Sequence, residues 1–200
     1  LEYLKTRENI AKAKLEIAQG LCKGGILLLN GDEPLLRNRE ELDGKNYRYV
    51  GFASDCHFRA ENVRYSMGMT LFDICYEGKT VKDVCIPTMG NHNVYAALFA
   101  YAVGVNMGLS DEMICHGLKC FKAVGMRQNI YEIGNVTVIE DCYNASPESV
   151  RAALHALSEM PVKGRRIAVL GDMLELGAQT EQLHYATGAH AAGVLDILVT

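Results

Sequence analysis

The sequence lacks the features that mark a membrane protein or a nucleic-acid-binding protein. No apolar run approaches the length that crosses a bilayer, and no secretory pattern opens the chain. The net charge is −4, and acidic and basic residues are interspersed. A nucleic-acid surface needs basic residues clustered on one face. We therefore expect neither membrane insertion nor a nucleic-acid partner.

The chain also lacks a C-x-x-C motif, although it contains seven cysteines. The number is odd, and most of these cysteines stand among apolar residues. Such usage is typical of buried, reduced thiols in a cytosolic protein, so we expect a cytoplasmic location. Cys142 stands in a polar loop instead, but no histidine follows at a suggestive spacing, and a catalytic thiol is not expected there.

A phosphate-binding P-loop is missing as well. Gly78-Lys79-Thr80 ends like one, but the motif requires a glycine five residues before its second glycine, and Asp73 occupies that position. The residues that follow, 81–86, continue as a strand, whereas a P-loop leads into a helix. Alternating apolar residues through 62–86 instead predict an antiparallel hairpin that turns at Glu77-Gly78-Lys79.

What is present is an alternation of helices and strands in a chain of about half hydrophobic residues, enough for a sizeable core. Residues 7–20 predict an amphipathic helix with Ile10, Ala13 and Ile17 on its apolar face. Residues 25–29 form a continuous apolar run, which is typical of a strand covered on both faces in a parallel sheet. Residues 47–52 predict a further strand.

The second half of the chain predicts a separate domain. The further predicted elements are helices at 94–107, 110–122, 147 onward and 180–192, and strands at 130–133, 136–140, 166–170 and 195–199. Gly125-Met126-Arg127-Gln128 is a short joint, where we place a boundary between domains at 1–125 and 126–200. Strand 130–133 is expected to pair with strand 136–140 through Gly134-Asn135. The order β-α-β-α-β from residue 136 onward implies a parallel sheet with right-handed crossovers.

Residues 134–150 are most typical of a ligand site. An apolar strand ends in a polar loop, and Ser146-Pro147-Glu148 then begins a helix with serine as N-cap and proline at the first helical position. The carboxyl end of a strand and the positive end of a helix converge there, where α/β sheets bind ligands. His92 and Asn93 also stand at a helix N-terminus, where the alternatives are capping and a ligand contact.

Three stretches in this order resemble the Mur ligases, which are ATP-dependent amide ligases of peptidoglycan precursor synthesis. They are NIAKAK at 9–14, GNHN at 90–93, and GMR at 125–127 followed by DCYNA at 141–145. Within the family, DCYNASP at 141–147 and GDMLELG at 171–177 look most like the branch that adds D-alanyl-D-alanine. The resemblance covers the whole of the chain.

The resemblance implies an α/β protein with three domains, of which this chain carries a part. The family has a UDP-sugar domain, a central P-loop-type ATPase domain and a Rossmann-like C-terminal domain. Residues 1–125 match the second part of the central domain, with a parallel sheet plus an antiparallel hairpin. Residues 126–200 match the first part of the C-terminal domain. We therefore expect a truncated, monomeric fragment that is inactive alone.

The reaction implied by the resemblance has two steps. ATP, with Mg²⁺, phosphorylates the terminal carboxylate of UDP-MurNAc-tripeptide, and the amine of D-Ala-D-Ala then displaces phosphate. One alternative is a sister ligase that adds a diamino acid or D-glutamate, or a folylpolyglutamate synthetase. Another is a non-catalytic nucleotide-binding module, which predicts loss of Lys14, Arg127 and Asp141; all three are present.

The resemblance also assigns residues in the first domain. Lys14 aligns with a lysine that several members carry as a carbamate, an anion that ligates Mg²⁺, so we expect it to be catalytic and metal-binding. This modification needs a neutral amine, hence a partly buried lysine; from spacing alone, Lys12 and Lys14 are solvated. Asn93 matches an asparagine that contacts the adenine region of ATP, although Ala96 replaces a second asparagine.

The remaining assignments lie in the joint and the second domain. Arg127 matches a catalytic interdomain arginine that reaches nucleotide phosphate, with a surface arginine as the alternative. Asp141 matches the acid that holds the ATP ribose, flanked by Tyr143 and Asn144. The candidates near D-Ala-D-Ala are Asp172, Glu175 and His184. For Asp172, a strand-to-helix turn with a helix cap is the alternative.

Overall fold

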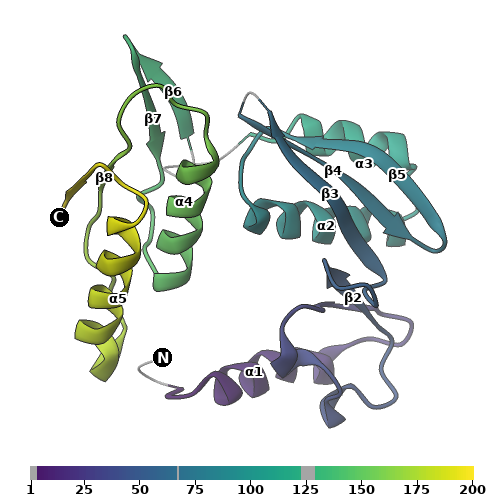
Figure 1. Cartoon of the computed structure of the whole chain (residues 1–200). Coiled ribbons are helices and arrows are strands. Elements are labelled where there is room, and N and C mark those ends of the chain that lie inside the picture. Colours follow the sequence, from purple (N-terminus) through teal and green to yellow (C-terminus); the bar gives the residue numbers. More distant parts are fainter. Residues whose placement is uncertain (1–3, 67, 123–128) are drawn as a thin grey trace. The chain divides into compact units, whose positions relative to one another are not determined.

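The computed structural model describes residues 4–66, 68–122 and 129–200, and these form two compact units (Figure 1). The first unit is Leu4–Lys122, and the described part of the second is 129–200. The boundary predicted at residue 125 lies outside the described residues and stays a prediction. Among the described residues, no helix is long and apolar enough to cross a membrane.

A five-stranded mixed sheet forms the centre of the first unit, in the order β1-β2-β3-β4-β5. Its strands are Leu27–Asn30 (β1), Tyr47–Gly51 (β2), Phe58–Ser66 (β3), Met69–Tyr76 (β4) and Lys79–Ile86 (β5). β1 to β3 are parallel and β3 to β5 antiparallel, so the predicted parallel sheet and hairpin belong to one sheet. Glu77 and Gly78 both have positive φ, the geometry of a type I′ hairpin turn.

Helices pack on this sheet and bury its central residues. The helical elements are α1 (Arg7–Leu15), the 3₁₀ turns Glu16–Gly20, Pro34–Leu36 and Glu40–Leu42, α2 (Asn91–Asn106) and α3 (Asp111–Lys119). α2 packs against strands β2 to β4, and α3 against β5 (Figure 1). Leu98 and Tyr101 of α2 are fully buried with Phe72 and Ile74 of β4. A second, smaller cluster joins Leu15 to Leu29 and Tyr49.

The apolar face predicted for the first helix is wrong. The buried residues are Ala11, Leu15 and Ala18, whereas Ile17 is 65% exposed. Both sets fit helical spacing, so periodicity did not separate them. Leu15 packs in one cluster with Leu29 of β1 and Tyr49 of β2, which selects this face. The helix also tightens into a 3₁₀ turn after Leu15, which alters the phase of the residues that follow.

The second unit contains two small sheets. Its elements are β6 (Asn129–Ile133), β7 (Val136–Glu140), α4 (Pro147–Glu159), β8 (Ile167–Val169), the 3₁₀ turn Gly177–Gln179, α5 (Thr180–Ala192) and β9 (Ile197–Val199). β6 and β7 form an antiparallel hairpin, and β8 and β9 are parallel. Leu154, Ala168 and Ala191 form the core between α4, β8 and α5.

The expected β-α-β-α-β sheet forms only in part. β8, α5 and β9 make the predicted parallel unit, but β7 is hydrogen-bonded to β6 and, within the described residues, belongs to a different sheet from β8. The β6–β7 pairing is local, because only Gly134 and Asn135 separate the strands, and closing such a short loop costs little entropy.

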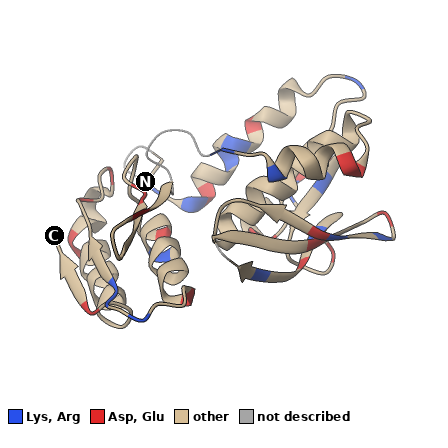
Figure 2. Ribbon diagram, turned by 90° about the horizontal axis from the view of Figure 1, so that it is seen from above, with Lys and Arg blue, Asp and Glu red and all other residues tan. Residues whose placement is uncertain are grey.

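The structure confirms the predicted free thiols but not their predicted burial, and it also shows the charged residues interspersed. All seven cysteines lie in the described residues and are free thiols, as predicted. None is fully buried, however: Cys22, Cys120 and Cys142 are exposed and the other four are partly buried. Figure 2 shows acidic and basic residues interspersed over the helices and strands of each unit.

Candidate functional site

Asn93 lies in the first turn of α2, behind a glycine that starts the helix. Gly90 is the N-cap with φ of 97°, and within the described residues no side chain caps this end. The Asn93 amide instead donates to the Met89 carbonyl at 2.7 Å. The capping alternative for Asn93 is therefore wrong, and its half-buried amide is fixed in the loop that enters the helix.

Asp32 ties the start of α2 to the carboxyl ends of β1 and β2. Its carboxylate accepts hydrogen bonds from the Phe52 and Ala53 amides at 2.6 and 2.8 Å and from the Tyr95 hydroxyl at 2.6 Å. A methyl group on Gly51 would lie 2.4 Å from this carboxylate, so the close approach requires glycine. Because Tyr95 is two residues beyond Asn93, this corner holds the first turn of α2.

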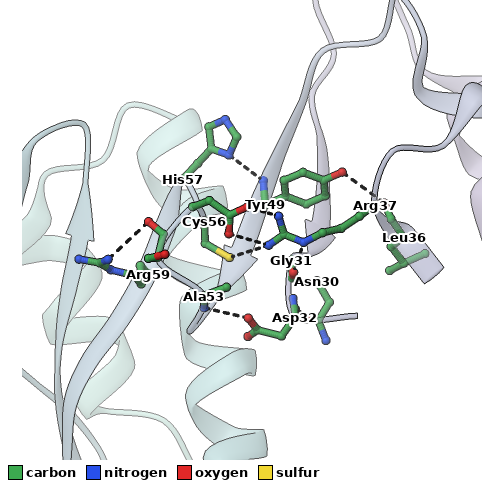
Figure 3. Close-up of polar contacts among 12 residues, drawn as sticks. Asn30, Gly31, Asp32, Leu36, Arg37, Tyr49, Ala53, Cys56, His57 and Arg59 are labelled. Atoms are coloured by element: carbon green, nitrogen blue, oxygen red, sulfur yellow. Dashed lines mark hydrogen bonds and ion pairs between the residues drawn. The ribbon is translucent and has the colours of Figure 1, made fainter. Parts of the chain in front are cut away.

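Arg37 contacts the residues on the other side of this corner, which we define as the loops that follow β1 and β2. Figure 3 shows Arg37 between Gly31 and Cys56, with Tyr49 beside it. Its guanidinium makes a bidentate pair with Asp55 and lies over the Tyr49 ring, 4.6 Å from the ring centre. The corner that follows β1 and β2 is therefore a connected polar network, which the sequence interpretation missed.

The hydrogen bonds in this corner keep Asp32 ionised. Burial by itself raises the pKa of Asp32, but the bonds from Tyr95, Phe52 and Ala53, with the nearby Arg37 charge, outweigh it and hold that pKa below its usual value. Burial and the bond to Asp32 raise the pKa of Tyr95 far above its usual value. The carboxylate is thus a permanent acceptor for these donors near neutral pH.

Lys14 is placed differently from the prediction. It lies in the last turn of α1, and its side chain is exposed, as is that of Lys12. The expectation of a partly buried lysine is wrong within this unit, because Ala11 and Leu15 form the buried face. Among the described residues, no group of three His, Cys, Asp or Glu side chains is arranged to hold a metal ion. A magnesium role for Lys14 stays a prediction.

The loop between β7 and α4 carries the predicted ribose contacts. Asp141, Tyr143 and Asn144 are all exposed, and they precede the helix N-terminus. Ser146 and Ser149 form a reciprocal capping box: each hydroxyl accepts from the backbone amide of the other, at 3.2 and 2.9 Å. The predicted serine cap is confirmed, and the box fixes the point where the loop enters α4.

Replacement of Ser146 by alanine is expected to destabilise α4 by about 1 kcal/mol, because the Ser149 amide loses its acceptor. Hydrogen exchange of the α4 amides measures this. Ser158→Ala is the matched control, because the Ser158 hydroxyl contacts His155 of the same helix, at its carbonyl oxygen (2.6 Å) and at ring Nδ1 (3.5 Å), and caps no helix N-terminus. Equal effects of the two substitutions would contradict a special role for the cap.

The loop between β8 and α5 is anchored by two buried side chains. Met173 and Leu176 are 4% and 9% exposed. Asp172 and Glu175 alternate with them and are exposed, and Glu175 has φ of 60°. GDMLELG therefore presents its two carboxylates and Leu174, which is 72% exposed, to solvent, while Met173 and Leu176 hold the loop.

Asp172 does not cap the following helix. α5 begins at Thr180, eight residues later, with Gln179 at the N-cap, and in this described part of the unit no side chain caps it. The capping alternative for Asp172 is therefore wrong. His184, from α5, lies 3.8 Å from Asp172 and accepts the Met173 amide hydrogen. Asp172, Met173 and His184 therefore lie next to one another. The sequence motifs did not predict this contact.

The predicted site residues fall in different parts of the chain. Lys14 and Asn93 belong to the first unit, while Asp141, Tyr143, Asn144, Asp172, Glu175 and His184 belong to the second. Arg127 lies outside the described residues. Asp32 and Tyr95 were missed, although Asn30-Gly31-Asp32 directly after an apolar strand is a signal that identifies such a corner.

Comparison with known families identifies the class of protein. Residues 1–104 match the Mur ligase middle domain, and residues 126–200 match the glutamate ligase domain of the Mur ligases. The chain belongs to the Mur ligase family, and its α/β fold is that expected from the resemblance.

Comparison with individual proteins shows which members of the family this chain resembles. The chain is 38% identical to UDP-N-acetylmuramoyl-tripeptide--D-alanyl-D-alanine ligase of Bacillus subtilis, over 94% of this chain and 40% of that protein. It is 36% identical to the Escherichia coli ligase of the same name, over 99% and 44%. The MurF ligase of Thermotoga maritima in complex with ADP superposes with a TM-score of 0.86 at 27% identity, over 99% and 45%. The chain thus spans less than half the length of these relatives.

Proposed function

We propose that the full-length protein containing this chain is an ATP-dependent, ADP-forming ligase that joins D-Ala-D-Ala to UDP-MurNAc-tripeptide. The observation that carries the proposal is the similarity to UDP-N-acetylmuramoyl-tripeptide--D-alanyl-D-alanine ligases of two organisms over nearly the whole chain, across both units. That similarity includes the second unit, which carries GDMLELG. We propose residues 1–125 as part of the central domain and 126–200 as part of the C-terminal domain.

The proposal assigns nucleotide contacts to residues of each unit, taken separately. Asn93 is held by Met89 at the start of α2 and would contact the adenine region. Asp141 would accept ribose hydroxyl hydrogens, with Tyr143 and Asn144 beside it, and Arg127 would pair with phosphate. The chemistry of these groups supports the assignments. The fixed Asn93 amide can hydrogen-bond to the edge of a base. The exposed Asp141 carboxylate can accept hydrogen bonds from hydroxyl groups, and the nearby amide groups at the helix N-terminus can donate to phosphate.

We propose that Mg²⁺ is coordinated by only a few protein ligands. Mg²⁺ commonly takes one or two carboxylates, with phosphate oxygens and water completing its shell. A carbamate on Lys14, in the last turn of α1, would supply one such anion. When bound, Mg²⁺ neutralises phosphate charge. The role of this chain is then to hold the lysine at the end of α1.

The reaction balances without any redox partner. A carboxylate oxygen of the tripeptide attacks the γ-phosphorus of ATP, and ADP leaves, which gives an acyl phosphate. The D-Ala-D-Ala amine attacks the acyl carbon, the C–O bond to phosphate breaks, and the amine loses its proton. Asp172, Glu175 and His184 would position the incoming dipeptide, and positioning accounts for much of the rate enhancement in such transfers.

A phosphate-release assay on the full-length protein tests this proposal. Release is expected only when ATP, UDP-MurNAc-tripeptide and D-Ala-D-Ala are all present. Free D-glutamate or a diamino acid in place of the dipeptide should support no release above background. Release with either of these and not with D-Ala-D-Ala would move the protein to a sister ligase, and no release with any acceptor would favour a nucleotide-binding module.

A further inference from the structure

The geometry around His184 fixes which of its ring nitrogens carries the proton. Nε2 lies 3.1 Å from the Met173 backbone nitrogen, and Nδ1 lies 2.8 Å from the Thr180 carbonyl oxygen. A backbone N–H only donates, and a carbonyl oxygen only accepts. Nδ1 therefore carries hydrogen and Nε2 accepts, so both contacts require the neutral Nδ1–H tautomer.

The Met173 contact connects α5 to the loop that carries Asp172. Met173 is also held at its sulfur, where the Thr187 hydroxyl donates across 3.9 Å. Thr187 lies one turn beyond His184, so two residues of one helix hold the main chain and the side chain of Met173. The neighbouring Asp172 side chain is 89% exposed, and its Oδ1 lies 3.8 Å from His184 Nε2.

We propose that His184 is a positioning residue, which as the neutral Nδ1–H tautomer holds the loop at 171–177 so that Asp172 faces the ammonium group of the incoming dipeptide. The dipeptide part rests on the proposed function; the tautomer and the anchoring do not. His184 acts through the Met173 amide and does not itself touch the substrate. Asp172 supplies the negative charge that attracts the amino terminus.

Two substitutions separate anchoring from general packing. The carboxamide oxygen of glutamine reaches the position of Nε2, so His184→Gln keeps an acceptor for the Met173 amide. Asparagine is shorter and matches only Nδ1, so His184→Asn loses that acceptor. His190→Asn, an exposed histidine in the last turn of the same helix, is the matched control.

Nitrogen-15 NMR of the 200-residue chain tests the tautomer without any activity. We expect His184 to show a protonated Nδ1 and an unprotonated Nε2 near neutral pH. The Met173 amide should exchange about tenfold faster with solvent in His184→Asn, and about as in the wild type in His184→Gln and His190→Asn. A protonated Nε2 in the wild type, or equal exchange in all variants, would overturn the proposal.

Kinetics of the full-length protein tests the dipeptide part. His184→Asn should raise the KM for D-Ala-D-Ala about tenfold with the KM for ATP unchanged, and His184→Gln should restore most of the loss. Equal changes in both KM values would overturn the positioning role. If the wild-type protein does not use D-Ala-D-Ala at all, the proposed function fails, and the NMR result still decides whether His184 anchors the loop.

Discussion

Replacement of Asp32 by alanine is expected to lower the free energy of unfolding of the Leu4–Lys122 unit by about 3 kcal/mol. The substitution removes the acceptor shared by the Phe52 and Ala53 amides and the Tyr95 hydroxyl. A partly buried donor left without an acceptor costs roughly 1–3 kcal/mol, and water reaches some of the three. Hydrogen exchange of the β2 amides measures the change within this unit.

Asp55 provides the matched control in the same corner. Its carboxylate pairs with Arg37 but is 64% exposed, and exposed ion pairs contribute about 1 kcal/mol or less. Asp55→Ala should therefore affect β2 exchange much less than Asp32→Ala. Similar losses for both would show that the Asp32 hydrogen bonds do not stabilise the corner.

The pH dependence of the same measurement follows from the lowered pKa of Asp32. A carboxyl group with a pKa lower in the folded state stabilises the protein above its unfolded pKa of about 3.9 and loses that contribution as pH falls through the folded value. Asp32→Asn cannot titrate, so the stability difference between wild type and this variant should shrink below about pH 4. A difference independent of pH would contradict the ionised carboxylate.

Replacement of Lys14 by alanine in the full-length protein is expected to reduce ligase activity on the order of 100-fold, as for loss of one preorganised charge at a phosphoryl-transfer site. Formate supplies a carboxylate oxygen to the vacated position, so added formate should restore part of the activity. Initial rates of phosphate release with saturating substrates provide the measurement, with and without formate or bicarbonate.

Lys12→Ala is the control for this substitution. Lys12 is exposed on the same helix, two residues earlier, and its loss should leave the activity within about twofold, since a solvated surface lysine contributes little. Full activity of Lys14→Ala both with and without formate would remove Lys14 from the metal site. Equal losses in both variants would point instead to the stability of α1.

The sequence predicted best where local chemistry decides the structure. The helix from Thr180, the serine cap at Ser146 and the Glu77-Gly78 turn were all predicted, because capping and turn geometry depend on residues a few positions apart. The buried face of α1 was not, because two sets of residues fit the same period and only packing against β1 and β2 chooses between them.

Contacts between distant residues were the least predictable part of the site. Asp32 and Tyr95 are 63 positions apart, and no local pattern joins them. His184 and Met173 belong to one recognisable motif region, yet only the fold shows that the imidazole accepts the Met173 amide. Family resemblance supplied residue roles that spacing alone does not, which is why the roles of Asn93, Asp141 and Lys14 stay proposals.

We propose that the full-length protein activates a peptide carboxylate as an acyl phosphate and transfers the acyl group to D-Ala-D-Ala. Tripeptide substrate labelled with ¹⁸O in its terminal carboxylate tests this directly, because the oxygen that attacks ATP leaves with phosphate. We predict that the released phosphate carries one ¹⁸O per amide bond formed, and that the ligated UDP-MurNAc-pentapeptide retains the other label in the carbonyl of the new amide bond. Phosphate free of ¹⁸O, with ligated product present, would contradict the account.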